Sequence, residues 1–241
     1  MKKAIIILLV ITTISACDIF QQVAKTATDS MNEPSLSTSE MAEGLKSALA
    51  VGTDNSVKLL NAENGFLNDN TVKIPFPQEI IKVKEKLEAA GLSDLTNKFV
   101  SELNKGASVA VKEALPIFKQ AITDMTIDDA KNILLGEKNA ATTYFKSKTK
   151  SKLYTSFKPK VTTVLENYGI NTAYTKMMEA YNKIPLVTPQ NTDLPDYVTN
   201  KAMDGLFLKI TLEEAKIREN INSRVNDILK KVFAWADSQK K

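Results

Sequence analysis

The chain has 241 residues, of which 43% are hydrophobic and 25% charged, a composition typical of a globular protein with a sizeable core. Its net charge of +4 is small and includes Lys2 and Lys3, so charge gives no reason to expect nucleic acid as a partner. With no histidine and one cysteine, the sequence excludes Ser-His and Cys-His nucleophile pairs, imidazole zinc sites and intrachain disulfides.

The first segment, MKKAIIILLVITTISAC, has the features of a secretory signal peptide. Two lysines precede an apolar run, and small residues precede Cys17. The run is shorter than the roughly 20 residues that a membrane span needs. A small-residue site that ends in cysteine is similar to the lipobox of bacterial lipoproteins, in which the peptide is cut before the cysteine and the cysteine is acylated. An ordinary signal peptide or an uncleaved apolar start is the alternative.

The lipobox predicts that residues 1–16 are removed and that lipid is attached to Cys17. Residues 17–35 are polar and weakly patterned, so we expect them to be a lipidated tether between the membrane and the domain. The predicted location is the cell envelope. The sequence leaves open whether the anchor lies in the outer or the inner membrane, and whether the domain faces the periplasm or the surface.

The helical domain is predicted to start at residue 36. Ser37 and Glu40 form a capping box, and a turn at Asn64-Gly65 should end the first helix. In the segment 66–77 two prolines limit any strand to a sheet edge. A tight loop is therefore more plausible there, and its apolar residues should hold it on the core: Phe66, Leu67, Ile74 and Phe76.

Two helices are predicted between residues 78 and 125. The first covers 78–90 and ends at Gly91, whereas Ser93 is expected to cap the second. Pro116 should kink or break that second helix. Its apolar face contains small residues that would let another helix approach closely, namely Gly106, Ala107, Ala110 and Ala114.

The second half is also predicted to be helical. A short helix capped at Thr126 should end at Gly136, and a long helix over about 140–157 should end at Pro159. Residues 161–168 and 171–184 are expected to form an antiparallel pair that turns at Gly169.

A proline-rich loop over 185–195 leads to a helix capped by Asp193. The run from Thr211 to Glu214 matches a further capping box, which predicts the start of another helix. A C-terminal helix precedes a polar tail at 237–241. The sequence thus predicts an all-α chain, with about eight to ten helices in a single domain over 36–236.

Several short runs recur together in one known family: GFLN at 65–68, IPFP at 74–77, MTIDDA at 125–130, KAMDGLF at 201–207 and IREN at 217–220. On these runs the chain resembles the bacterial lipoprotein family catalogued as domain-of-unknown-function family 4197 (DUF4197), over roughly residues 36–233. The resemblance implies a helical architecture and export, and it supplies no activity. Ile221 departs from the family, whose members usually have proline there, and this change should loosen the local turn.

The window from Lys138 to Lys160 contains seven lysines and no acidic residue. Four of them make a candidate anion-binding patch: Lys146, Lys148, Lys150 and Lys152. At about 100° per residue, Lys146 and Lys150 lie near one another, and the other two lie roughly 160–200° away. Lysines that flank a buried aromatic ridge explain the pattern as well as a binding patch does.

A second candidate is a polar cluster made of Lys201, Asp204, Glu214, Arg218 and Asn220. The pairs Lys201–Asp204 and Glu214–Arg218 each share a helix face, and two helices joined at Thr211 could bring the pairs together. Two carboxylates in a cleft could perform acid–base chemistry of the kind used in sugar hydrolysis. A salt-bridge network that fixes the turn between the helices is the alternative.

These features predict an exported, lipid-anchored domain that acts by binding or envelope scaffolding. The alternative is a carboxylate-based hydrolase acting on envelope sugar or lipid. A third possibility is a binder of anionic polymer, whose affinity should fall with salt and with Lys148→Glu plus Lys152→Glu. We expect no catalytic residue, metal or cofactor. The expected partners are the membrane, through acylated Cys17, and an envelope protein or an anionic polymer.

Overall fold

A computed structural model describes residues 36–89, 91–167, 169–172, 174–175, 178 and 193–239. Contacts divide the chain into two units, Met1–Leu36 and Ser37–Lys241. Within the described residues there are eight α-helices, three short 3-10 helices and no strand, which confirms the predicted all-α class. The predicted signal peptide, Cys17, the tether up to residue 35, most of the predicted helix over 171–184 and most of the loop over 185–195 lie outside the described residues.

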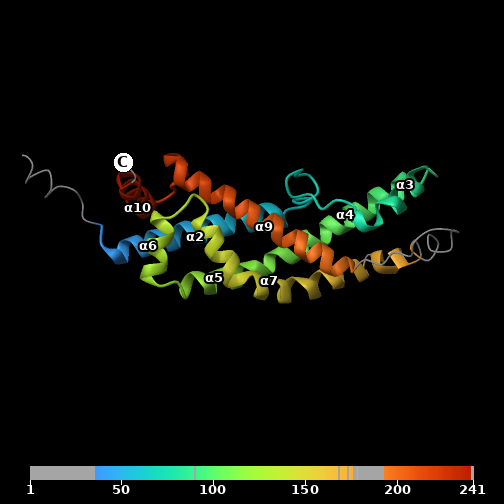
Figure 1. Ribbon diagram of the computed structural model, residues 1–241, viewed down its shortest axis with the longest axis horizontal. Coiled ribbons are helices and arrows are strands. Elements are labelled where there is room, and N and C mark those ends of the chain that lie inside the picture. Colours follow the sequence, from blue (N-terminus) through green and yellow to red (C-terminus); the bar gives the residue numbers. More distant parts are fainter. Residues whose placement is uncertain are drawn as a thin grey trace, which may run out of the picture. The chain divides into compact units, whose positions relative to one another are not determined.

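The helices follow one another in the order seen in Figure 1. The α-helices are α2 (Thr38–Asn61), α3 (Ile81–Ala89), α4 (Ser93–Ala110), α5 (Ala114–Thr123), α6 (Ile127–Leu135), α7 (Ala140–Asn167), α9 (Leu194–Glu219) and α10 (Asp227–Ser238). The 3-10 helices are η1 (Gln78–Ile80), η2 (Val111–Glu113) and η3 (Ile221–Ser223).

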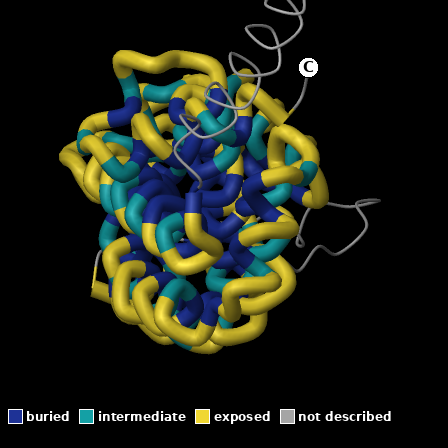
Figure 2. The backbone as a smooth tube through the Cα atoms, turned by 90° about the vertical axis from the view of Figure 1, so that its left-hand side faces the viewer, coloured by how far each residue is buried: buried dark blue, intermediate teal, exposed yellow. Residues whose placement is uncertain are grey.

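Helix α9 is central to the packing of the second unit. It contacts α7 along much of its length and also packs against α2 and α4, while α2 contacts α5, α6 and α10. Buried residues lie between these helices and exposed residues on their outer faces, as Figure 2 shows. No helix within the described ranges is both long and apolar enough to cross a membrane.

Of the predicted helix caps at Ser37, Ser93 and Thr126, the first and the last are confirmed and the second is wrong. The Ser37 hydroxyl accepts a hydrogen bond from the Glu40 amide, and the Glu40 carboxylate accepts one from the Ser37 amide. Thr126 and Asp129 form the same arrangement. Ser93, in contrast, is the first residue of α4 and caps nothing. The positive φ of Gly91, +79°, turns the chain so tightly that Leu92 takes the cap position.

The prediction that Pro159 ends a helix is wrong, because α7 continues through it to Asn167. Proline in a helix interior costs about 3 kcal/mol. Phe157 and Val161, on either side of it, are fully buried, and their packing offsets this cost. Pro159 itself is exposed, so water can reach the carbonyl that lost its donor. Residues 161–167 therefore belong to α7 rather than to a separate helix, although Gly169 has the left-handed φ of a turn, +66°.

The predicted helix start at Thr211 is also wrong, since α9 runs without a break from Leu194 to Glu219. The Thr211 hydroxyl donates to the carbonyl of Phe207, four residues earlier, at 2.9 Å. A threonine inside a helix commonly makes this bond, and it leaves no capping role for the side chain. The cap at Asp193 is confirmed, because its carboxylate accepts from the Asp196 amide at 2.9 Å.

The predicted helix is interrupted before Pro116, because α4 is followed by the 3-10 helix η2 and then by α5. Pro116 lies in the first turn of α5, where a helix has no partner for the missing N–H. The small residues of α4 allow a close approach, as expected. A Cβ atom added at Gly106 would lie 3.7–3.9 Å from side chains of α7 and α9.

Residues 62–77 form a loop, which includes the loop predicted over 66–77 and begins a few residues earlier because α2 ends at Asn61, and Phe66, Ile74 and Phe76 are buried in the core. Its fourth expected anchor, Leu67, is only half-buried. The side chain of Asn104 on α4 holds the loop at both polar groups of Ile74: its Oδ1 accepts from the Ile74 amide at 2.8 Å and its Nδ2 donates to the Ile74 carbonyl at 2.9 Å. The loop is thus fixed on α4 by backbone contacts as well as by apolar burial.

Candidate functional site

The structure does not bring the five residues of the predicted polar cluster together. Asp204 and Glu214 lie on the same straight helix, ten residues and therefore about 15 Å apart along its axis. Glycosidase carboxylates are about 5–9.5 Å apart. Asp204 and Lys201 are exposed, and the Lys201 ammonium lies 5.9 Å from the ring centre of Tyr197. The predicted contact between the two pairs is wrong because it required a turn at Thr211.

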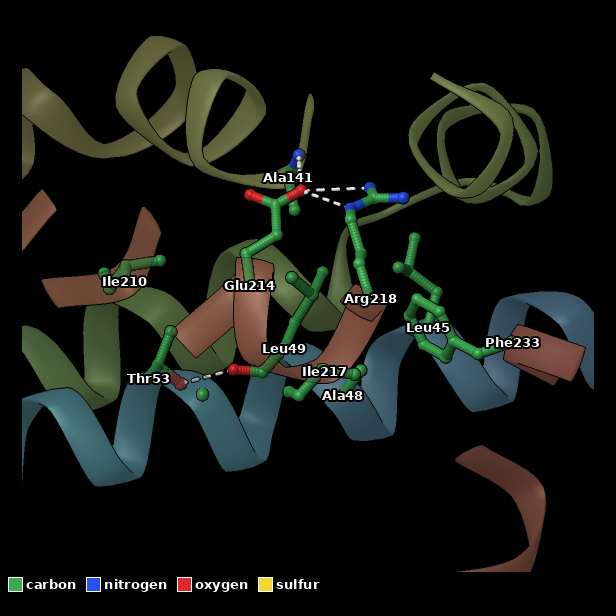
Figure 3. Close-up of a pocket in the computed structure, with 11 residues that line it drawn as sticks. Leu45, Ala48, Leu49, Thr53, Ala141, Ile210, Glu214, Ile217, Arg218 and Phe233 are labelled. Atoms are coloured by element: carbon green, nitrogen blue, oxygen red, sulfur yellow. Dashed lines mark hydrogen bonds and ion pairs between the residues drawn. The ribbon is translucent and has the colours of Figure 1, made fainter. Parts of the chain in front are cut away.

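Glu214 is buried and caps a neighbouring helix (Figure 3). Its Oε1 accepts from the amide of Ala141 at 3.0 Å, and its Oε2 accepts from the amide and the hydroxyl of Thr142 at 2.9 and 2.8 Å. Ala141 and Thr142 are in the first turn of α7, whose amides have no partner within that helix. A carboxylate from α9 therefore provides the N-terminal cap of α7.

Arg218, one turn further along α9, makes the complementary contacts. Its Nε donates to Glu214 Oε1 at 3.0 Å, while Nη1 and Nη2 donate to the carbonyls of Leu134 and Ile133 at 3.2 and 2.8 Å. These carbonyls belong to the last turn of α6. The pair thus places an anion at the start of one helix and a cation at the end of another, as the helix dipoles favour. We call this pair the Glu214–Arg218 clamp.

Arg224, which sequence reasoning missed, closes the end of α9. Its Nε and Nη2 donate to the carbonyls of Ile217 and Arg218, and Nη2 also pairs with Asp237 on α10 at 2.8 Å. A cation just after a helix end is the sequence signal that could have indicated this role. Asn220 has a local role too, because its side chain caps η3 by accepting from the Asn222 amide.

A small cavity lies beside the clamp, between α2, α9, α10 and the start of α7 (Figure 3). Apolar side chains line most of it, and its volume is ≈ 20 Å³. A space of that size holds about one water molecule. Both oxygens of Glu214 are already engaged, so the clamp has the features of a structural ion pair rather than of a substrate cleft.

The more accessible feature is an open groove of ≈ 790 Å³ between α7 and α9, which we call the α7–α9 groove. Two of the four candidate lysines line it, together with hydroxyl and amide side chains and no carboxylate. The polar lining residues on the first three turns of α7, and on α9 opposite, are Lys146, Lys150, Thr143, Ser147, Ser151 and Asn200.

The four candidate lysines thus separate into two pairs, as helix geometry predicts. Lys148 and Lys152 do not line the groove. The Lys148 ammonium lies 5.6 Å from the ring centre of Tyr144. It also contributes to a lowered pKa of Asp129, whose main cause is the hydrogen bond from the Thr126 amide.

At one end of the groove lies a hydrogen-bonded cluster of one tyrosine, one lysine and two carboxylates, with a net charge of −1. Tyr154, which lines the groove, donates to Asp196 at 2.5 Å. The Lys158 ammonium bonds to the Tyr154 hydroxyl at 3.1 Å and to Asp193 at 3.0 Å. The hydrogen bond with Tyr154 has the larger effect and that with Asp193 the next, and both raise the pKa of Lys158. The acids at this end are therefore engaged with Tyr154 and Lys158 and leave the two groove lysines unpaired.

A buried lysine that the sequence reasoning also missed ties the 62–77 loop to α9. The Lys209 ammonium, only 7% exposed, lies 2.5 Å from Asp69 and donates to the hydroxyl of Thr71 at 3.0 Å. The hydrogen bond from Lys209, followed by that from Thr71, lowers the pKa of Asp69 to about 2. No group of three or more His, Cys, Asp or Glu side chains in the described residues could hold a metal ion.

Because the pKa of Asp69 is lowered in the folded state, its ion pair contributes to the free energy of unfolding at neutral pH and loses this contribution in acid. Its ordinary pKa is 3.8, so the contribution is complete above about pH 4 and is lost as the pH falls through about 2. We expect Asp69→Asn to be less stable than the wild type at pH 7 and equal to it near pH 2, measured by urea unfolding across that range. Asp54→Asn, which breaks only an exposed pair with Lys58, should show no such convergence.

The family model for a protein of unknown function, DUF4197, matches residues 35–234. No curated protein and no solved structure matches the chain.

Proposed function

The chain belongs to the DUF4197 family, whose function is unknown, and we propose that it is a lipid-anchored helical domain of the cell envelope that binds or scaffolds other envelope components without catalysing a reaction. The anchor is Cys17, and the domain that it holds at the membrane is the helical unit that begins at Ser37. Each buried methylene of an acyl chain contributes about 0.8 kcal/mol to membrane binding, so two or more chains retain a protein without a membrane span.

The Glu214 carboxylate is buried and both of its oxygens already accept hydrogen bonds, and this observation favours binding over hydrolysis. The carboxylate accepts from Ala141, Thr142 and Arg218, and it is buried beside a cavity of ≈ 20 Å³. A general acid or nucleophile must reach its substrate, directly or through one water. Asp204, the other acid proposed for hydrolysis, is about 15 Å away along α9. The α7–α9 groove, in contrast, is open and presents only donors and neutral groups.

Labelling of the full-length chain with radioactive palmitate in a bacterium with a lipoprotein pathway tests the anchor. We expect the wild type to carry label and to sediment with membranes. Cys17→Ser should lose the label and leave the membrane fraction, because no other cysteine can be acylated. The matched control is Cys17→Ser combined with Ser30→Cys, which moves the thiol along the tether and should stay unlabelled.

An unmodified Cys17 thiol in the mass spectrum of the native protein would contradict the anchor. The non-catalytic role has a separate test, which is incubation of the purified protein with envelope glycans and lipids. Turnover that is lost in Asp204→Asn or Glu214→Gln, while the far-ultraviolet circular dichroism stays unchanged, would establish the hydrolase instead.

A further inference from the structure

We propose that the α7–α9 groove binds a phosphate group of a ligand, with Lys146 and Lys150 as its cationic contacts. This inference deepens the proposed function, on which it rests, by naming the chemistry of the bound group. The phosphate can belong to a lipid headgroup or to a soluble phosphorylated compound.

The two lysines are suitably placed and free to bind. They are four residues apart on α7, so their Cβ atoms are about 6 Å apart on one helix face. Both line the groove, both are exposed, and neither has a hydrogen bond or an ion pair with any described residue. Two other lysines of these helices are engaged in ion pairs, since Lys158 on α7 pairs with Asp193, and Lys209 on α9 pairs with Asp69.

The charges around the groove leave it positive. No Asp or Glu is among its lining residues. Asp196, at its end, already accepts from Tyr154. Asp204 is exposed one helical turn from Asn200, outside the lining. An anion in the groove would therefore meet two ammonium groups before it meets a carboxylate.

The donor set fits phosphate better than carboxylate. A phosphate group carries about −1.5 to −2 charges and three acceptor oxygens that point in different directions. The groove offers two ammonium groups and the hydroxyls of Thr143 and Ser151 as donors. The Ser147 hydroxyl already donates to the Tyr144 carbonyl at 2.7 Å, and the Asn200 amide uses one of its two hydrogens on the Asp196 carbonyl at 3.0 Å. A carboxylate has only two oxygens, which lie in one plane, and would leave part of this donor set unused.

The position of the remaining lysines favours a local phosphate site over a track for a long polyanion. Lys148 and Lys152 lie on the same helix outside the groove. The basic surface is therefore interrupted around α7. Tyr154 and Met203 give the groove an apolar portion, against which the group that carries the phosphate can lie.

Calorimetric titration of the full-length chain in a neutral detergent tests the proposal with two probes. One is inorganic pyrophosphate, and the other is phosphatidic acid in mixed micelles with phosphatidylcholine. Lys146→Gln plus Lys150→Gln should weaken binding by about tenfold or more, because each lysine contributes a charge-assisted hydrogen bond. Lys148→Gln plus Lys152→Gln removes the same charge from the same helix and should change the affinity by less than about twofold.

The two probes identify the source of the phosphate. Binding of phosphatidic acid alone indicates a lipid headgroup, binding of pyrophosphate alone indicates a soluble ligand, and either result supports the proposal. The proposal is overturned if neither probe binds, if the two lysine pairs weaken binding equally, or if succinate binds as tightly as pyrophosphate. Cys17→Ser should bind pyrophosphate normally, so failure of the anchor and failure of the groove are separate results.

Discussion

Glu214→Ala is expected to lower the free energy of unfolding by about 3–5 kcal/mol, the cost of removing one partner of a buried ion pair. Arg218 would remain buried with an uncompensated charge, because its side chain is only 7% exposed. The first turn of α7 would also lose the acceptor for its Ala141 and Thr142 amides. The loss should therefore be among the largest for any single polar substitution in the domain.

Urea unfolding at neutral pH measures this loss, and Glu213→Ala is the matched control. Glu213 is the adjacent residue, and its side chain, 17% exposed, pairs with the exposed Lys216 and accepts a hydrogen bond from Asn55 at 3.0 Å. Its replacement should cost about 1–2 kcal/mol, clearly less than the loss at Glu214. The double variant Glu214→Leu plus Arg218→Met should recover a large part of the loss, because replacing both partners of a buried pair by apolar residues is often neutral. A loss below 1 kcal/mol for Glu214→Ala would mean that the clamp does not hold the helix ends.

Asn104→Leu is expected to cost about 2–5 kcal/mol. Leucine has the same number of side-chain heavy atoms and the same branching but leaves the amide and the carbonyl of Ile74 buried without partners, at about 1–3 kcal/mol for each group. Because Ile74 and its neighbour Phe76 are buried, water cannot easily replace these bonds. The change should also loosen the 62–77 loop, which hydrogen exchange of the amides in that loop would detect.

The control for this substitution is Asn97→Leu, on the same helix. Asn97 is exposed, so the same chemical change there should alter the free energy of unfolding by less than about 0.5 kcal/mol. Equal effects at the two positions would show that Asn104 acts through helix propensity and not through its bonds to Ile74.

Local signals in the sequence were enough to predict the helical class and several helix ends. The boxes at Ser37 and Thr126 and the cap at Asp193 involve partners three residues away, so the pattern contains all the information that the cap requires. The errors at Pro159 and Thr211 have the opposite cause. In both places packing of a long helix against distant neighbours overrides a local signal that usually marks a helix end.

The contacts of the Glu214–Arg218 clamp could not be predicted from the sequence for the same reason. Glu214 and Arg218 were identified as a pair on one helix face, but their roles depend on Ala141 and Ile133, more than seventy residues away. The division of the four lysines could be predicted, because helical periodicity alone separates Lys146 and Lys150 from the other two. The sequence could not predict which of the two pairs lines a groove, because the groove depends on where α9 packs against α7. The test suggested by sequence alone, at Lys148 and Lys152, thus becomes the control.

In the proposed division of roles, buried charges of α9 hold the fold, while the open α7–α9 groove binds the ligand. This division is tested by measuring pyrophosphate affinity and the free energy of unfolding for two variants of the full-length chain. Lys146→Gln plus Lys150→Gln should lose affinity about tenfold and keep its stability, and Glu214→Ala should lose about 3–5 kcal/mol of stability and keep its affinity. Loss of affinity in the second variant while the first binds normally would contradict this division.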